Sequence, residues 1–368
     1  MQAQQGTKMK KWILVAGARP NFMKIAPLMK EIATNKEIDP ILVHTGQHYT
    51  PGMSKVFFDE LDIPEPQINL EVGSGTHAQQ TAEIMKRFEP VLEKEKPVLV
   101  IVVGDVNSTI ACALTAAKLN IKVAHVEAGL RSFDRTMPEE LNRILTDALA
   151  DYLFITEPAA LDNLLREGIP RQKIFFVGNT MIDTLKANLE KIEQSPILHQ
   201  LKLEKQAFVL LTLHRPANVD RKEEIVNIRR ALEKIAKTYP VVFPAHPRTV
   251  ERMKEFHVDF DFLTVVPPLG YIDFMNLVLH SYCVLTDSGG IQEETTALGK
   301  PCITLRENTE RPVTIQQGTN RLTGTNPKKI IKAISSISQN PRIRKPRIKY
   351  WDGKAAQRIV KILLEKIK

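Results

Sequence analysis

The chain has 368 residues, of which 43% are hydrophobic and 25% are charged. This composition is typical of a globular protein and excludes disorder along the whole chain, while the length favours two domains. Three cysteines in so long a chain exclude a disulfide scaffold, and no Cys-x-x-Cys pair occurs. We expect Cys112, Cys283 and Cys302 to be small buried hydrophobic residues.

Basic residues outnumber acidic residues by 51 to 42, an excess that can mark a protein that binds nucleic acid or a membrane surface. Ten Lys and Arg but only two Asp and Glu lie in Pro341–Lys368, so this tail carries most of the excess. No RRM, KH or zinc-finger pattern accompanies it. We therefore predict no nucleic-acid partner, and a tail that binds nucleic acid or a membrane surface is the alternative.

The apolar runs are too short to form the core of a signal peptide or a membrane-spanning helix. The N-terminal run Trp12–Ala16 is shorter than the core of a signal peptide. Longer runs such as Val98–Val103 have the length of a strand, far below a membrane span. We predict a cytoplasmic protein without a membrane partner.

In the first half, short apolar runs alternate with amphipathic stretches. The runs are continuous rather than alternating, which is typical of parallel strands covered on both faces. The predicted strands are Trp12–Ala16, Ile41–His44, Val98–Val103, Val123–Val126, Tyr152–Ile155 and Ile174–Val177. The predicted helices are Phe22–Ile32, His77–Lys94, Thr109–Lys118 and Glu139–Leu149.

The pattern pauses over the polar stretch Lys186–Gln206 and then restarts. The second set of predicted strands is Phe208–Thr212, Val241–Phe243, Leu263–Val265, Cys283–Thr286 and Cys302–Leu305. Helices are predicted at Lys222–Thr238, Tyr271–His280, Gly290–Leu298 and, at the end of the chain, Ala355–Ile367. The fold class is therefore α/β, with two doubly wound domains joined near residues 180–206.

Ligands of open α/β sheets bind beyond the carboxyl ends of the strands, so the residues that follow each strand are the candidates for chemistry. After the first strand comes a glycine turn with Arg19 and Lys24, which suits a phosphate. It is neither a G-x-G-x-x-G nor a Walker A motif, which argues against a standard dinucleotide site or a P-loop. An ordinary turn with solvated cations is the alternative.

Three acidic residues occupy similar positions in the first half. Asp105 follows one predicted strand and is either a catalytic carboxylate or the cap of the next helix. Glu127 follows the next strand and is either used in the reaction or paired with Arg131. Glu139 and Glu140 follow Pro138 and either complement a helix dipole or supply one carboxylate to the site.

In the second half, His214 follows a predicted strand as a candidate acid, base or phosphate ligand, with a structural histidine as the alternative. Ser288, Gly289 and Gly290 follow another strand and open a helix whose bare N–H groups suit a diphosphate. Glu294, one turn further, suits a pair of ribose hydroxyls. A simple turn with a helix cap is the other interpretation of this segment.

Eleven ordered motifs together resemble the non-hydrolysing UDP-N-acetylglucosamine 2-epimerase family over nearly the whole chain. They are GARPNFMK, TGQHYTPGM, GDVNST, HVEAGLRS, PEELNR, GNTMID, LHRPAN, AHPRT, LTDSGGIQEE, LGKPCI and TERP. The resemblance implies a GT-B-like fold with two Rossmann-like domains and an interdomain cleft. It assigns residues 9–180 and the terminal helix 355–368 to the first domain, and residues 181–354 to the UDP-binding domain.

The resemblance also implies reversible conversion of UDP-GlcNAc to UDP-ManNAc without NAD or metal, in a homodimer. In this chemistry UDP is eliminated to leave a 2-acetamidoglucal and is then added back. The catalytic positions of the family match Asp105, Glu127, Glu139 and His214. The substrate-binding positions match Arg19, Lys24, Phe274, Ser288, Gly289, Gly290, Glu294 and Arg311. A second, activating UDP-GlcNAc site matches Gln47, His48 and His246.

Some positions depart from the common family pattern. The first turn has Ala18 and Asn21 where GTRPE is frequent, and Leu269 stands where many members have Gln. Related enzymes acting on UDP-2,3-diacetamido-uronic acids share a GARP-type turn, so such a sugar is an alternative substrate. A second alternative is a GT-B glycosyltransferase, which needs an acceptor and has no evident use for three acidic residues.

Overall fold

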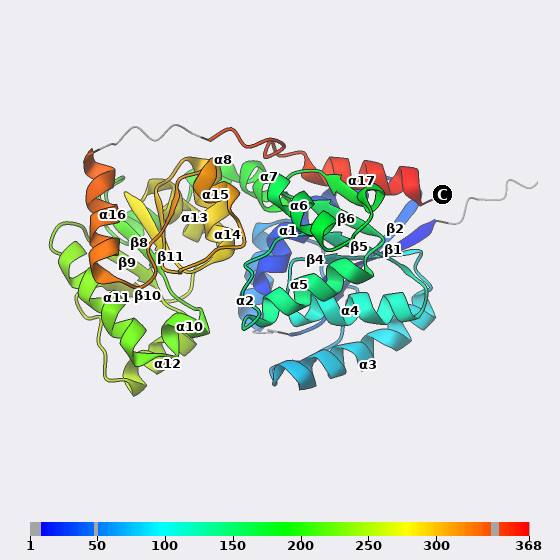
Figure 1. The fold of residues 1–368 in the computed structure, drawn as a ribbon, viewed down its shortest axis with the longest axis horizontal. Helices are drawn as coiled ribbons and strands as arrows, with labels where there is room; N and C mark the ends of the chain where they lie inside the picture. The colour runs from blue at the N-terminus through cyan, green and yellow to red at the C-terminus, as the bar shows by residue number, and fades with distance from the viewer. Residues whose placement is uncertain (1–8, 48–50, 340–345, 368) are drawn as a thin grey trace, which may run out of the picture. The chain divides into compact units, whose positions relative to one another are not determined.

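The computed structural model describes residues 9–47, 51–339 and 346–367 (Figure 1). The chain divides into two compact units, the first made of Met1–Ala187 and Lys349–Lys368 and the second of Asn188–Ile348. Each unit has one parallel sheet with helices packed against it. The doubly wound α/β class predicted from the sequence is confirmed.

The first unit contains a seven-stranded sheet of order β3-β2-β1-β4-β5-β6-β7, and all of its strand pairs are parallel. Its strands are β1 Lys10–Ala16, β2 Ile38–His44, β3 Ile68–Asn69, β4 Leu99–Val103, β5 Lys122–Val126, β6 Tyr152–Ile155 and β7 Ile174–Phe176. Because the chain builds outward from β1 in one direction and from β4 in the other, the switch point lies between β1 and β4. Doubly wound sheets bind ligands at this point.

Helices cover both faces of this sheet. They are α1 Arg19–Ile32, α2 Pro51–Glu60, α3 His77–Glu95, α4 Asn107–Lys118, α5 Pro138–Leu149, α6 Pro158–Arg166, the short 3₁₀-helix Arg171–Lys173, α7 Thr180–Ala187 and α17 Ala355–Lys366. Strand side chains such as Ile13 and Val15 pack with Ile84 and Phe88 of α3. On the other face, α1, α7 and α17 contact one another (Figure 1).

The second unit contains a six-stranded parallel sheet of order β10-β9-β8-β11-β12-β13, with its switch point between β8 and β11. Its strands are β8 Val209–Thr212, β9 Val241–Pro244, β10 Thr264–Val266, β11 Cys283–Thr286, β12 Cys302–Thr304 and β13 Asn320–Leu322. Its helices are α8 Leu189–Glu193, α9 Ile197–Gln200, α10 Pro216–Val219, α11 Lys222–Ile235, α12 Pro247–Glu255, α13 Tyr271–His280, α14 Gly289–Leu298, α15 Val313–Gln316 and α16 Pro327–Gln339.

The core of the second unit lies between its sheet and helices α11, α12 and α16. Ile225, Ile228 and Leu232 of α11 are spaced three and four residues apart and are all buried there. Cys283 and Cys302 are buried in this unit and Cys112 in the first, as predicted.

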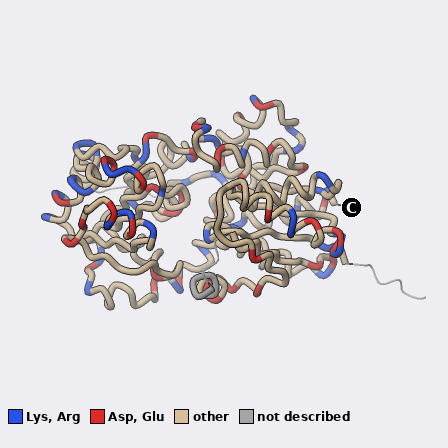
Figure 2. Tube along the Cα trace, turned by 90° about the horizontal axis from the view of Figure 1, so that it is seen from below, with Lys and Arg blue, Asp and Glu red and all other residues tan. Residues whose placement is uncertain are grey.

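Helix α17 carries part of the basic tail but is fixed to the first unit by apolar packing and buried hydrogen bonds. Ile359 and Leu363 are fully buried. The Trp351 indole donates to the carbonyl oxygen of Thr156 at 3.1 Å. Figure 2 shows basic and acidic residues interspersed along the trace of each unit. In the described part of the chain, no helix is both long and apolar enough to cross a membrane.

Asp183 of α7 meets the first turn of α17, where a carboxylate oxygen accepts the N–H of Ala356 at 2.8 Å. Burial raises the pKa of Asp183 to about 6, although the N–H groups of Ala356 and Ala355 lower it in part. The folded pKa is therefore higher than the unfolded value. The stabilising contribution is fully present below the unfolded pKa, near 3.9, and is lost as pH rises through about 6.

We predict that Asp183→Asn removes this pH dependence. Between about pH 4 and about pH 7, the free energy of unfolding of the native protein should fall by roughly 2 kcal/mol relative to the variant. Urea unfolding across this range measures the difference. Asp162→Asn, at an exposed position of α6, is the control and should keep the native slope. Parallel pH profiles for the native protein and Asp183→Asn would contradict the prediction.

Candidate active site

Glu127 and Lys24 form a buried ion pair in the first unit. The Lys24 amine lies 2.7 Å from the Glu127 carboxylate, and their side chains are 5% and 3% exposed. Sequence analysis offered Arg131 as the alternative partner of Glu127, and that alternative is wrong. Arg131 instead contacts Asp147 and Glu167, at 2.7 and 2.6 Å.

The backbone of Glu127 is also strained, with φ at 75°, a region that residues with a Cβ rarely adopt. Such a conformation costs on the order of 1–3 kcal/mol and is concentrated at functional sites. Gly104 lies beside the pair at the end of β4, with φ at 68°. A Cβ on Gly104 would lie 2.8 Å from the Lys24 amine, so a side chain there would displace the amine, and the positive φ also favours glycine.

The turn between β1 and α1 is closed by Asn21. Its side-chain oxygen accepts the N–H groups of Gly17 and Ala18, both at 3.0 Å, and its amide donates to the Val103 carbonyl at 3.1 Å. Asn21 therefore joins the two strands at the switch point. An ionised glutamate at this position would have no proton to donate to Val103.

Asp105 lies beside Arg143 of α5, with 2.5 Å between its carboxylate and the guanidinium group. The same guanidinium contacts Glu140, also at 2.5 Å. The alternative that Asp105 caps the next helix is wrong, since the N-cap of α4 is Val106 and makes no side-chain cap. Arg143 thus joins a partly exposed carboxylate to a buried one.

The two acidic residues of the first turn of α5 have different surroundings. Glu140 is buried and accepts the N–H groups of Ser132 and Phe133. Burial alone would raise the pKa of Glu140, but these N–H groups and Arg143 outweigh it and lower the pKa. Glu139 is only partly buried. Glu140 therefore holds the loop, which leaves Glu139 as the accessible carboxylate of the turn.

Two further predicted residues lie in the first unit. Arg19 is exposed at the start of α1, and its guanidinium lies 4.9 Å from the centre of the Phe57 ring. Such a cation–π contact orients an exposed cation without neutralising it. Gln47 is buried and accepts hydrogen bonds from the backbone and the hydroxyl of Ser108, at 3.0 and 2.7 Å. His48 lies outside the described residues.

In the second unit, His214 and Asp287 follow the two strands at the switch point. The Nδ1 atom of His214 is 3.0 Å from Asp287, and the imidazole is 51% exposed while the carboxylate is fully buried. The carboxylate also accepts the backbone N–H groups of His214 and Arg215. Burial alone would raise the pKa of Asp287, but these contacts lower it to about 2. The arrangement presents an oriented, accessible imidazole backed by an ionised carboxylate.

Gly289 begins α14, and Ser288 is its N-cap but makes no side-chain cap. A Cβ on Gly289 would lie 2.3 Å from a guanidinium nitrogen of Arg311, so glycine lets this cation approach the helix start. Arg311 also contacts Glu310 and Glu293. A helix N-terminus and a cation at one point attract an anion such as a diphosphate.

Glu310 organises the cations near this turn. It is 1% exposed and contacts Arg306 at 2.7 Å, Arg215 at 3.5 Å and Arg311. Burial alone would raise its pKa, but the three guanidinium groups hold the pKa of Glu310 well below its usual range. Three arginines share this carboxylate, so positive charge remains for a ligand.

The other predicted residues of the second unit lie on the surrounding helices. Glu294 is buried one turn into α14, and its charge adds to burial in raising the pKa of the Tyr271 phenol well above its ordinary value. Phe274 is partly buried on α13. His246 is exposed at the N-cap of α12 and accepts the N–H of Arg248 at 3.3 Å.

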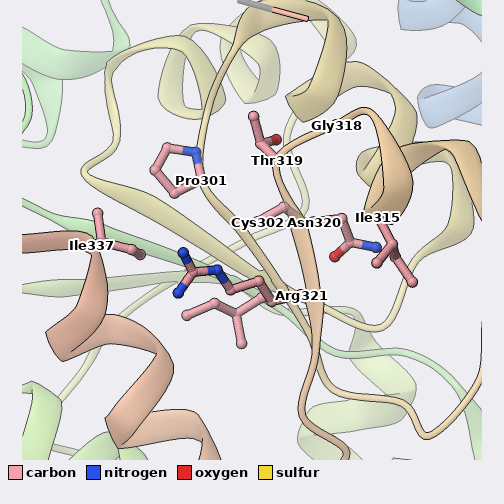
Figure 3. A pocket seen from close by; sticks show the side chains of 9 residues that line it. Pro301, Cys302, Ile315, Gly318, Thr319, Asn320, Arg321 and Ile337 are labelled. Atoms are coloured by element: carbon pink, nitrogen blue, oxygen red, sulfur yellow. The ribbon is translucent and has the colours of Figure 1, made fainter. Parts of the chain in front are cut away.

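A cavity of about 470 Å³ lies at the amino-terminal ends of β12 and β13 (Figure 3). Cys302 and Asn320, which start the two strands, line it together with Arg321. None of the predicted site residues lines this cavity. Within the described ranges, no group of three His, Cys, Asp or Glu residues could hold a metal ion.

Comparisons with known proteins extend over nearly the whole chain. The family described as UDP-N-acetylglucosamine 2-epimerase matches residues 30–364. The chain is 46% identical over 361 residues to the UDP-N-acetylglucosamine 2-epimerase of Methanocaldococcus jannaschii, which covers 95% of this chain and 98% of the relative. The chain belongs to the UDP-N-acetylglucosamine 2-epimerase family. It is therefore an epimerase, and the resemblance predicted from its motifs is confirmed.

Two further similarities bear on the fold and on the substrate. A solved structure of the M. jannaschii UDP-GlcNAc 2-epimerase in complex with UDP-GlcNAc and UDP has a TM-score of 0.91 at 45% identity, covering 97% of this chain and 100% of that one. This similarity confirms the GT-B-like fold class. The UDP-2,3-diacetamido-2,3-dideoxy-D-glucuronate 2-epimerase of Pseudomonas aeruginosa is 40% identical over 356 residues, covering 96% and 99%.

The sequence analysis did not assign roles to Arg143, Asp287 and Glu310. All three lie inside the motifs PEELNR, LTDSGG and TERP. Each is nearly buried and carries a charge, and each contacts a predicted site residue. Buried charges require partners, so the position of Asp287 directly after an apolar strand was an available signal, whereas Arg143 and Glu310 follow no apolar run.

We predict that Asp287→Asn lowers kcat by about 100-fold with a much smaller change in KM, because the imidazole of His214 loses its orienting anion. Steady-state kinetics with the epimerase substrate measures both constants. Asp261→Asn, at an exposed position of the same unit, should leave both unchanged. An unchanged kcat in Asp287→Asn would show that the buried carboxylate does not serve the histidine.

Proposed function

We propose that the protein interconverts UDP-GlcNAc and UDP-ManNAc by inverting C2 of the sugar. One observation carries the proposal: a chain 46% identical to a UDP-N-acetylglucosamine 2-epimerase places strained Glu127, paired with Lys24, directly after a sheet strand. Asp105 follows β4, the neighbour of β5, and Glu139 lies in the first turn of α5. These groups suit the transfer of a proton to and from carbon.

The chemistry of the substrate explains why both carboxylates and cations are needed. The C2 proton of a GlcNAc unit is not acidic, because no carbonyl group adjoins C2. If the bond between C1 and the phosphate oxygen breaks, UDP leaves with the electron pair and C1 becomes positive. A carboxylate then removes the C2 proton, which leaves a 2-acetamidoglucal and UDP. Return of a proton to the opposite face of C2, with re-addition of UDP to C1, completes the inversion.

In this proposal, residues of the second unit bind the nucleotide, and residues of the first unit transfer the protons. In the second unit, the start of α14 with Ser288, Gly289 and Gly290 receives the diphosphate, Arg311 neutralises it, and His214 hydrogen-bonds or protonates it as it departs. Glu294 holds the ribose and Phe274 lies against the nucleotide. In the first unit, Asp105, Glu127 and Glu139 share the proton steps, with Arg19 and Lys24 supplying positive charge. A second UDP-GlcNAc site using Gln47, His48 and His246 is a separate proposal.

The sugar could instead be a UDP-2,3-diacetamido-uronic acid. The P. aeruginosa relative that is named for such a substrate is 40% identical to this chain. The first turn with Ala18 and Asn21 is the feature that favours this second candidate. The higher identity to the M. jannaschii enzyme favours UDP-GlcNAc.

We predict that incubation with UDP-GlcNAc alone in D₂O places deuterium at C2 and produces UDP-ManNAc, as seen by proton NMR. The elimination requires exchange because the removed proton is not the one returned. The same assay with a UDP-2,3-diacetamido-uronic acid compares the two sugars directly. Faster exchange at C2 with the uronic acid than with UDP-GlcNAc would identify the uronic acid as the substrate.

A glycosyltransferase is the control hypothesis for this assay. It would leave UDP-GlcNAc and its C2 proton unchanged until an acceptor was added. Absence of exchange with both sugars, followed by sugar transfer when an acceptor is present, would contradict the proposed epimerase chemistry.

We also propose a homodimer in the cytoplasm. Support for the dimer comes from α5, where Leu141 and Leu145 are 38% and 54% exposed on one face of the helix. A second copy of the chain would cover this apolar stripe. Light scattering should give twice the monomer mass of 41.6 kDa. Detection of the monomer mass alone would contradict the proposed dimer.

A further inference from the structure

His125, the fourth residue of β5, is fully buried and makes two short polar contacts. Its Nδ1 atom lies 2.7 Å from the Asp147 carboxylate, and its Nε2 atom lies 2.8 Å from the carbonyl oxygen of Gly104. Neither ring nitrogen has a role in the chemistry proposed above. The contacts nevertheless define the charge of the ring.

Both partners of the ring can only accept a hydrogen bond. A backbone carbonyl has no proton to donate, and an ionised carboxylate has none either. Asp147 is ionised, because it also accepts the N–H of Gly129 at 3.0 Å and the guanidinium of Arg131 at 2.7 Å. Burial alone would raise the pKa of Asp147, but the charges and hydrogen bonds of His125 and Arg131 lower it. Both nitrogens of His125 must therefore donate, which makes the ring a cation.

The charge balance of the buried group leads to the same result. Its members are His125, Asp147, Arg131 and Glu167, and Arg131 contacts both carboxylates. With a neutral ring, the group would carry one net negative charge in a region where His125, Arg131 and Asp147 are almost inaccessible to water. With a charged ring, two cations balance two anions, which is the arrangement that burial tolerates.

The carbonyl group held by this ring belongs to the turn that carries the candidate acid. Gly104 precedes Asp105, and its missing side chain leaves room for the Lys24 amine that pairs with Glu127. A hydrogen bond from a cation is stronger than one from a neutral group. The ring thus fixes the backbone from which both Asp105 and the buried ion pair are placed.

We propose that His125, with a proton on each ring nitrogen, is an imidazolium that positions the Gly104–Asp105 turn for catalysis. It is a positioning residue, because it contacts the turn rather than a substrate. Its effect on turnover rests on the proposed epimerase function, whereas its protonation state does not.

The protonation state is tested by ¹⁵N NMR of the full chain labelled at histidine, with His125→Asn to assign the signals. We expect the spectrum at about pH 7 to show both ring nitrogens of His125 protonated, with the exposed His199 as the reference signal. A deprotonated nitrogen on His125 at neutral pH would overturn the proposal. This measurement needs no substrate, so it remains valid if the epimerase function fails.

The positioning role is tested with Asp147→Asn, which removes the carboxylate but keeps the size of the side chain. The ring then lacks the anion that favours its charged form, so kcat should become about tenfold lower at about pH 8 than at about pH 6, with little change in KM. His199→Asn is the matched control and should retain the pH profile of the native enzyme. A loss of kcat that is equal at every pH, or no loss, would show a structural role only and overturn the positioning claim.

Discussion

The buried ion pair between Lys24 and Glu127 is the constraint on which the first unit depends. Two charges with almost no access to water are stable only while each neutralises the other, and removing one partner of such a pair typically costs about 3–5 kcal/mol. The pair lies where the backbone is unusual, since Glu127 and Gly104 both have positive φ and the Lys24 amine occupies the space that a side chain at 104 would take. Strand β5, the start of α1 and the end of β4 are therefore tied together where the switch point of the sheet exposes the strand ends.

Ion pairs with a buried partner also hold the other candidate site residues. Arg143 holds Asp105 and Glu140, Asp287 orients His214, and Glu310 gathers three arginines close to the start of α14. In each case a buried partner fixes a charge that the proposed reaction uses. Asp105 and His214 remain partly accessible, whereas Arg311 is itself buried. Preorganised charges of this kind suit the proposed elimination of a diphosphate, because they stabilise the developing charge without reorganisation during the reaction.

Much of this architecture could be predicted from the sequence because parallel strands give continuous apolar runs. The helix Tyr271–His280 has the predicted boundaries, and α1 begins three residues before its predicted start because Pro20 suits the first helical turn. Strand β3 has only two residues, and β13, Asn320–Leu322, has a single apolar residue, so neither gives an apolar run. Which carboxylate pairs with which cation could not be predicted, since partners such as Asp105 and Arg143 are 38 residues apart and meet only in the folded sheet. For the same reason, the pairing of Glu127 with Arg131, its near neighbour in sequence, was the wrong alternative.

The central claim is that Glu127, held by Lys24, carries a proton step at C2. The most direct measurement is the rate of C2 exchange in Glu127→Gln, made alongside the double variant Lys24→Met with Glu127→Gln. The double variant removes both buried charges and should recover most of the stability that the single variant loses. The account predicts that exchange falls by at least about 100-fold in both variants, so the loss does not follow stability. Exchange in Glu127→Gln within about threefold of the native rate would contradict it.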